Sequence, residues 1–115
     1  MSARDQSVLT KARRVHAPVF AALGDETRLS LVAKLCEGSP QSIARLTEGS
    51  KLTRQAISKH LQVLEDAGIV AGVRVGRECQ YGFNPRPIDG IKNYLDEVSR
   101  QWDDALGRLK SFIER

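Results

Sequence analysis

Apolar residues recur at helical spacing between residues 52 and 64 and predict one amphipathic helix. Residues three, four and seven apart stack on one side of an α-helix, so a regular apolar stripe indicates the face that packs inward. That stripe consists of Leu52, Ile57, Leu61 and Leu64. The opposite face carries hydrogen-bonding side chains with two positive charges and no acid: Arg54, Gln55, Ser58, Lys59 and Gln62.

The pattern before this segment predicts three shorter helices, at residues 17–23, 26–37 and 41–47. Pro18 would lie in the first turn of the first helix, where the missing N–H of proline is tolerated. Asp25 would cap the second helix. The helix at 41–47 and the amphipathic helix, joined by a turn that contains glycine, predict a helix-turn-helix.

Two runs typical of β-strands follow, at residues 69–75 and 78–83. Gly76 lies between them and can take the positive φ that a tight hairpin needs. A hairpin directly after a helix-turn-helix is typical of a wing, and Arg74 and Arg77 lie at or near its tip. A basic wing tip commonly contacts the DNA backbone or a minor groove. The alternative is an ordinary hairpin that faces solvent.

A proline-containing break at residues 84–87 precedes one long predicted helix at residues 88–115. Its apolar residues alternate spacings of four and three, which is typical of a helix that packs on a partner. We expect this helix and the helix at 17–23 to form a homodimer; the alternative is that the long helix folds back on its own domain. The residues assigned to the dimer interface are Val19, Phe20, Leu23, Ile91, Leu95, Val98, Trp102, Leu106, Leu109 and Phe112.

The length of 115 residues fits one domain. The predicted fold class is mainly α with a small β-hairpin wing (α+β): a winged helix-turn-helix that dimerises through its terminal helices. Residues 1–15 are predicted to form a flexible basic N-terminal arm. Residues 16–115 would form the winged helix-turn-helix domain, including the dimerisation helix at 88–115. No apolar run approaches the ~18 residues of a membrane span, and no signal-peptide pattern is present, so we expect a cytoplasmic protein without membrane contact.

The charge distribution favours a nucleic-acid partner. The net charge is +4 and the pI is about 9.4. Residues 41–86 hold seven basic and four acidic residues, whereas residues 88–115 hold five basic and six acidic residues. The positive excess therefore coincides with the predicted helix-turn-helix and wing, where it can neutralise the phosphates of DNA.

The polar face of the amphipathic helix also fits base recognition, because Arg and Gln read guanine and adenine in the major groove. Thr53 can cap the helix and leave backbone N–H groups for a phosphate. His60, next to Leu61, is assigned to packing or to a phosphate rather than to a metal. The alternative is a solvated surface helix on a small core. The residues assigned to double-stranded DNA are Lys51, Thr53, Arg54, Gln55, Ser58, Lys59, His60, Arg74 and Arg77.

Residue types suited to metal binding or catalysis are sparse. Cys36 and Cys79 lie far apart and form no Cys-x-Cys or Cys-x-x-Cys pair. We expect both to be structural or inert, since free cysteines are often buried, although a redox response through either is an open alternative. His16 and His60 lie in different elements, and no nucleophile with a base or glycine-rich phosphate loop is present. We therefore predict no enzyme activity, no cofactor and no metal.

Two segments resemble bacterial winged-helix repressors of the ArsR type. Residues 22–29 (ALGDETRL) match the start of that family's second helix, and residues 52–70 (LTRQAISKHLQVLEDAGIV) match its recognition helix and the beginning of its wing. The resemblance covers about residues 16–114, and the combination of the two motifs is specific. It implies a dimeric DNA-binding regulator, usually a repressor that leaves its promoter when a signal lowers its affinity.

The chain departs from the metal-sensing members of that family. Those members carry a Cys-x-Cys on the third helix, where this chain has residues 39–43 (SPQSI). Other members place histidines and acids on the C-terminal helices, and residues 88–115 contain no histidine. Because transition-metal sites favour Cys and His, the resemblance points to the metal-free subgroup.

These observations predict a sequence-specific DNA-binding transcriptional regulator, with repression as the favoured role. It would bind a two-fold-symmetric operator with the helix at 53–67 in the major groove and the wing at 69–84 on the backbone or in the minor groove. A small-molecule effector is left open, and the sequence identifies neither the operator nor the regulated genes. The alternative function is a protein-interaction module that uses the C-terminal helix. The basic face of the amphipathic helix favours the regulator.

Overall fold

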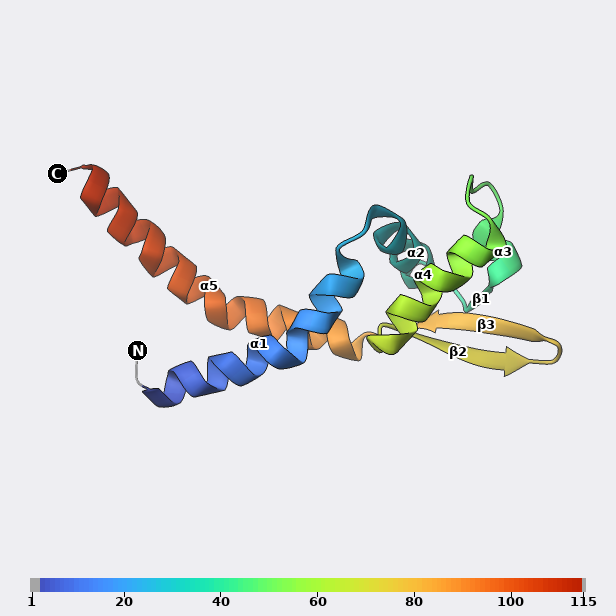
Figure 1. Cartoon of the computed structure of the whole chain (residues 1–115), viewed down its shortest axis with the longest axis horizontal. Helices are drawn as coiled ribbons and strands as arrows, with labels where there is room; N and C mark the ends of the chain where they lie inside the picture. The colour runs from blue at the N-terminus through green and yellow to red at the C-terminus, as the bar shows by residue number, and fades with distance from the viewer. Residues whose placement is uncertain (1–2, 115) are drawn as a thin grey trace.

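The computed structural model describes residues 3–114 and has an elongated shape, with extents of 64 × 30 × 22 Å. A helical body occupies its centre, a β-hairpin projects from one end and the C-terminal helix extends from the other (Figure 1). In chain order the elements are α1 (Ala3–Leu23), α2 (Glu26–Cys36), β1 (Gln41–Ser42), α3 (Ile43–Thr47), α4 (Arg54–Asp66), β2 (Val70–Val75), β3 (Glu78–Phe83) and α5 (Arg86–Ile113). The fold is therefore mainly α with a small antiparallel sheet, as predicted.

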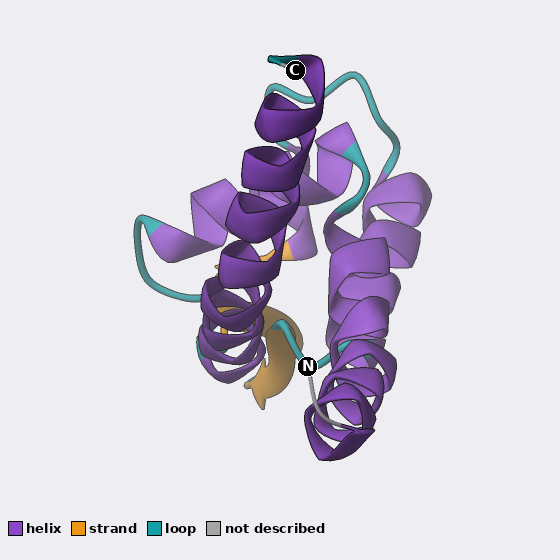
Figure 2. Cartoon of the chain, turned by 90° about the vertical axis from the view of Figure 1, so that its left-hand side faces the viewer, coloured by secondary structure: helices purple, strands orange, loops and turns teal. Residues whose placement is uncertain are grey.

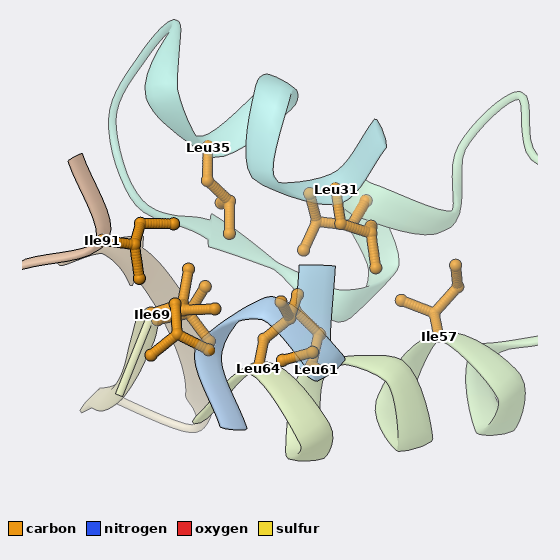
Figure 3. Packing of buried hydrophobic residues seen from close by; sticks show 11 residues of the cluster. Leu31, Leu35, Ile57, Leu61, Leu64, Ile69 and Ile91 are labelled. Atoms are coloured by element: carbon orange, nitrogen blue, oxygen red, sulfur yellow. The ribbon is translucent and has the colours of Figure 1, made fainter. Parts of the chain in front are cut away.

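The core gathers around the apolar face of α4 (Figure 3). Ile57, Leu61 and Leu64 are at most 2% exposed. Their buried neighbours are Leu31 and Leu35 of α2, Ile69 in the turn that follows α4, and Ile91 of α5. Burial of one such side chain contributes about 1.5–3 kcal/mol, so this face fixes which side of α4 points to solvent. The predicted inner face is confirmed, except that Leu52 lies outside the helix and is exposed.

The sheet has the strand order β1-β3-β2, with both pairs antiparallel. β2 and β3 pair from Val70 opposite Phe83 to Val75 opposite Glu78, and Gly76 in the turn has a φ of 64°. The predicted hairpin is confirmed. The small third strand β1 was not predicted: residues 41 and 42 pair with β3, and α3 begins only at residue 43. The reason is that Ser42 Oγ accepts from the Arg45 N–H at 3.2 Å and caps the helix there.

α1 corrects the prediction for the N-terminal segment. The first helix was expected to start near residue 17 after a flexible arm, but α1 is helical from Ala3 and Pro18 lies inside it. Residues 1–2 of the predicted arm lie outside the described part. Proline in a helix interior costs about 3 kcal/mol, and packing on α5 offsets this cost. The Tyr94 ring lies 5.6 Å from the ring of His16 and 6.1 Å from that of Phe20, between centroids.

α5 divides into a covered first half and an exposed second half. Ile91 and Val98 are buried against their own chain, as is Val19 of α1. Beyond them α1 and α5 diverge toward their free ends (Figure 1 and Figure 2). Intramolecular packing thus already covers three of the residues assigned to the dimer interface, Val19, Ile91 and Val98. The alternative that α5 folds back on its own domain holds for this first half only.

The second half of the apolar stripe on α5 is exposed. Leu106 is 60% exposed, Leu109 52% and Phe112 71%. Leu95 and Trp102 are also exposed. None of the helices in residues 3–114 is both long and apolar enough to cross a membrane.

Candidate nucleic-acid interface

The N-terminal end of α4 is built by the predicted cap. Thr53 Oγ1 accepts from the Ala56 N–H at 3.1 Å, and the Thr53 carbonyl accepts from the Ile57 N–H at 3.0 Å. The cap satisfies backbone groups that would otherwise lack a partner at the start of the helix. It also fixes the first turn, which carries Arg54 and Gln55, so that both side chains are exposed.

The outer face of α4 is polar and accessible. Arg54, Gln55 and Lys59 are exposed, and Ser58 is half-buried. Gln62, farther along the helix, donates to Asp66 Oδ1 at 2.8 Å and is already engaged. The accessible polar groups therefore concentrate in the first two turns of α4, which is the part of a recognition helix that contacts base edges in a helix-turn-helix.

The turn between α3 and α4 adds another cation to the same end. Lys51 is exposed, and Ser50 Oγ accepts from the Leu52 N–H at 3.1 Å. Gly49 has a φ of 74°, a conformation that residues with a side chain rarely adopt. Lys51 therefore lies in the turn two residues before Thr53, the cap of α4.

The hairpin carries the two predicted wing arginines. Arg74 lies on β2 opposite Cys79, and Arg77 lies in the turn; both are exposed. Glu78 is nearby in sequence but accepts from Gln80 Nε2 at 3.2 Å. The base of the hairpin is anchored because Asn84 Nδ2 donates to the Gly68 carbonyl at 2.9 Å. The structure therefore places both arginines on a projecting hairpin (Figure 1).

His60 is the predicted DNA residue that the structure places differently. Its Nδ1 lies 3.2 Å from Arg28 Nη1 and 3.7 Å from Asp25 Oδ2. The side chain is 24% exposed. Its Nδ1 is therefore directed at the start of α2 rather than at solvent. Sequence reasoning treated the position as one of packing or phosphate contact and did not anticipate this internal partner.

Arg28 makes contacts between elements that the sequence did not indicate. Its Nε donates to the Ala22 carbonyl at 2.6 Å and its Nη2 to the Ala21 carbonyl at 3.5 Å. Both carbonyls lie in the last turn of α1, and that of Ala21 also accepts from the Gly24 N–H at 3.2 Å. The sequence feature that could have indicated these contacts is the position of Arg28, three residues after the capping aspartate Asp25.

Asp25 holds the start of α2. Its Oδ2 accepts from the Arg28 backbone N–H at 3.0 Å, so the predicted cap is confirmed. This backbone hydrogen bond lowers the pKa of the Asp25 carboxyl below its ordinary value of 3.8, against a smaller opposing effect of burial, and the charge of Arg28 lowers it further. The carboxylate is therefore ionised at neutral pH.

The cysteines do not fit the expectation of burial, since Cys36 and Cys79 are both exposed free thiols. Cys79 lies on the hairpin next to Tyr81, and partial burial together with a hydrogen bond to that thiol raises the pKa of the Tyr81 hydroxyl. Residues 3–114 contain no group of three or more His, Cys, Asp or Glu side chains arranged to hold a metal.

The arrangement of α3, turn, α4 and hairpin defines the class of the protein. A capped helix presents an exposed polar face, a shorter helix precedes it, and a two-stranded wing follows it. This is the architecture of a winged helix-turn-helix protein.

Comparison with known proteins identifies the family. Residues 23–73 match a family described as a helix-turn-helix domain. The transcriptional regulator Rv2034 of Mycobacterium tuberculosis is 33% identical over 95 residues, which is 83% of this chain and 85% of that protein. The arsenical resistance operon repressor of Bacillus subtilis is 30% identical over 78 residues, 68% of this chain and 74% of that protein. An ArsR-like transcriptional regulator from Rhodococcus sp. RHA1 superposes with a TM-score of 0.71 at 36% identity, covering 86% and 92% of the two chains.

The chain belongs to the ArsR-type family of winged helix-turn-helix transcriptional regulators. The family and the fold are those of DNA-binding regulators and not of enzymes. The resemblance noted in the sequence is thereby confirmed.

Proposed function

We propose that the protein is a transcriptional repressor that binds a two-fold-symmetric operator as a homodimer. α4 would enter the major groove and the hairpin would lie on the backbone or in the minor groove. The observation that carries this proposal is the exposed polar face of α4, with Arg54 and Gln55 in the first turn after a formed cap. The repressors among the relatives support the direction of regulation.

The residues divide between affinity and specificity. Cations on the turn, on α4 and on the wing would neutralise phosphates, which supplies most of the sequence-independent binding energy; these are Lys51, Lys59, Arg74 and Arg77. Side chains in the first two turns of α4 would read base edges; these are Arg54, Gln55 and Ser58. Thr53 would offer its hydroxyl hydrogen to a phosphate while its oxygen caps the helix.

The homodimer would form through the exposed half of α5. Apolar side chains exposed in a continuous stripe are unusual on a monomer and mark an interaction surface. The proposed interface residues are Leu95, Trp102, Leu106, Leu109 and Phe112. Phe20 and Leu23 pack against the core and keep partial exposure, so they would contribute at its edge. A two-fold axis would then place the two reading helices about 34 Å apart.

The regulator would belong to the metal-free subgroup. Support comes from the sequence, which has no Cys-x-Cys at residues 39–43 and no histidine in residues 88–115. A small-molecule effector would find room in the groove of about 520 Å³ where α1 and α5 diverge, lined in part by Leu9, Tyr94 and Trp102. Residues 16–115 would form the functional unit, with the basic first half of α1 extending from it.

The direct test is binding to the DNA upstream of the protein's own gene, measured with a salt titration and an excess of non-specific competitor DNA. We expect a footprint with two-fold symmetry that survives the competitor. Weak binding that is equal for all sequences would contradict the proposal. It would favour the protein-interaction module, with the exposed half of α5 as its binding surface.

Replacement of Arg77 by alanine should weaken binding to every DNA sequence by a similar factor. The reason is that a wing-tip cation contacts phosphates, which carry no sequence information. The slope of log K against log salt should fall by about 0.9 for each lost phosphate contact, hence by about 1.8 for a dimer. Arg100→Ala on α5 is the matched control and should leave the slope unchanged. A loss confined to one operator variant would show that Arg77 reads a base instead.

A further inference from the structure

We propose that Arg28 and His60 form a positioning bridge that fixes the orientation of α4 relative to the end of α1. The Arg28–His60 bridge comprises the guanidinium of Arg28, the imidazole of His60 and the two α1 carbonyls that the guanidinium binds. In this assignment His60 supports DNA reading from inside the protein and does not contact phosphate. The inference rests on the proposed function insofar as α4 is the helix that reads DNA.

The geometry of the bridge joins three helices. The guanidinium of Arg28, on α2, reaches the Ala22 carbonyl at 2.6 Å and the Ala21 carbonyl at 3.5 Å, both at the end of α1. Its Nη1 lies 3.2 Å from His60 Nδ1 on α4. One side chain therefore connects the last turn of α1 with the middle of the reading helix. α1 in turn packs against α5, which carries the exposed apolar stripe.

The chemistry of the two side chains sets the direction of the contact. A guanidinium has only donors, so the neutral imidazole must accept through Nδ1 and hold its proton on Nε2. The Asp25 carboxylate lies 3.7 Å from the same Nδ1, and the positive charge of Arg28 compensates for the repulsion between carboxylate and lone pair. Asp25 also accepts from the Arg28 backbone N–H, which fixes the position from which the arginine extends.

The Arg28–His60 bridge is a directional contact, whereas the apolar contacts on the inner face of α4 are not directional. Ile57, Leu61 and Leu64 hold α4 by apolar contacts, and such contacts are not directional. A small rotation of α4 about its own axis keeps much of that burial but moves Arg54 and Gln55 away from the base edges. A hydrogen bond at residue 60 has strict limits on distance and angle. It therefore resists the rotation that apolar packing tolerates.

Two isosteric variants distinguish the inward role of His60 from an outward one. In His60→Asn the amide oxygen lies close to the place of Nδ1 and can accept from Arg28; in His60→Gln the amide group lies close to the place of Nε2. We expect His60→Asn to bind the footprinted operator within about threefold of wild type and His60→Gln to lose about tenfold, a typical coupling for residues in contact. Thermal unfolding of both variants checks that the difference in operator affinity does not come from a difference in folding stability.

The opposite result would overturn the bridge: if His60→Gln keeps operator affinity and His60→Asn loses it, His60 contacts a phosphate through Nε2. Equal affinities of the two variants, high or low, would overturn it as well. Arg28→Lys should reduce affinity about as much as His60→Gln, and the double variant should lose little more than either single variant. Additive losses would show that the two side chains act independently.

A measurement without DNA separates the bridge from the proposed function. Nitrogen-15 NMR of the His60 ring in the full chain should show a proton on Nε2 and an Nδ1 resonance that shifts in Arg28→Lys. An unchanged Nδ1 resonance would overturn the bridge. If the resonance shifts but wild type fails to recognise any operator, the contact is established and the proposed DNA-reading function is the part that fails.

Discussion

The double variant Leu106→Glu, Leu109→Glu is expected to be a folded monomer that loses at least about a thousandfold in operator affinity, the lower end of the range that separates specific from non-specific binding. The measurements are sedimentation equilibrium for the oligomeric state and a binding titration with the footprinted operator. This is the largest effect that we expect from any substitution, because it separates the two reading helices.

The physical reason lies in the exposure of these side chains. Leu106 and Leu109 are 60% and 52% exposed in the single chain, and neither belongs to its buried core. Glutamates at these positions face water in the monomer and leave its fold intact. In a dimer they would bury four carboxylates, and burial of an unpaired charge is strongly unfavourable. Each half-site would then be bound by a separate chain, and the additional affinity that results when one dimer binds both half-sites would be lost.

Ser111→Glu is the matched control, because it adds a glutamate at an exposed position of α5 on the side of the helix opposite Leu106 and Leu109. It should remain dimeric and keep its operator affinity. If the double variant stays dimeric, the interface lies elsewhere. If it becomes monomeric yet binds the operator as wild type does, two-fold recognition is contradicted and a single chain is the binding unit.

Replacement of Gln55 by alanine is expected to have the second largest effect. Gln55 is exposed in the first turn of α4, directly after the Thr53 cap. A glutamine that pairs with a base edge contributes about 1–3 kcal/mol of discrimination. The loss should therefore be about 2–6 kcal/mol for a dimer with two half-sites, together with a relaxed preference at one base position in each half-site.

The measurement is the affinity of wild type and Gln55→Ala for operators that carry each of the four bases at the contacted position. Gln62→Ala is the matched control: it lies on the same helix and is exposed, but it donates to Asp66 at 2.8 Å. It should change neither affinity nor preference. If Gln55→Ala binds every base variant as wild type does, the assignment of α4 as the reading helix is incorrect.

The helix α4 and the hairpin were predictable from local sequence. The inner face of α4 follows from helical spacing, its start from Thr53, and the hairpin turn from Gly76, which has the expected positive φ. Each of these features depends on interactions within a few residues, so the order of residues alone specifies it. The same holds for the cap at Asp25, which forms as predicted.

The sequence determined the class of the protein: its helix-turn-helix, its wing and the polar side chains that face outward. Only the tertiary structure decided that α1 continues through Pro18, that Val19, Ile91 and Val98 are covered, and that His60 faces Arg28. All three depend on contacts between elements far apart in the chain. The spacing of apolar residues shows that a helix face is buried, but it does not show which element covers that face. A hydrogen bond between residues 28 and 60 forms only when α1, α2 and α4 have taken up their folded arrangement.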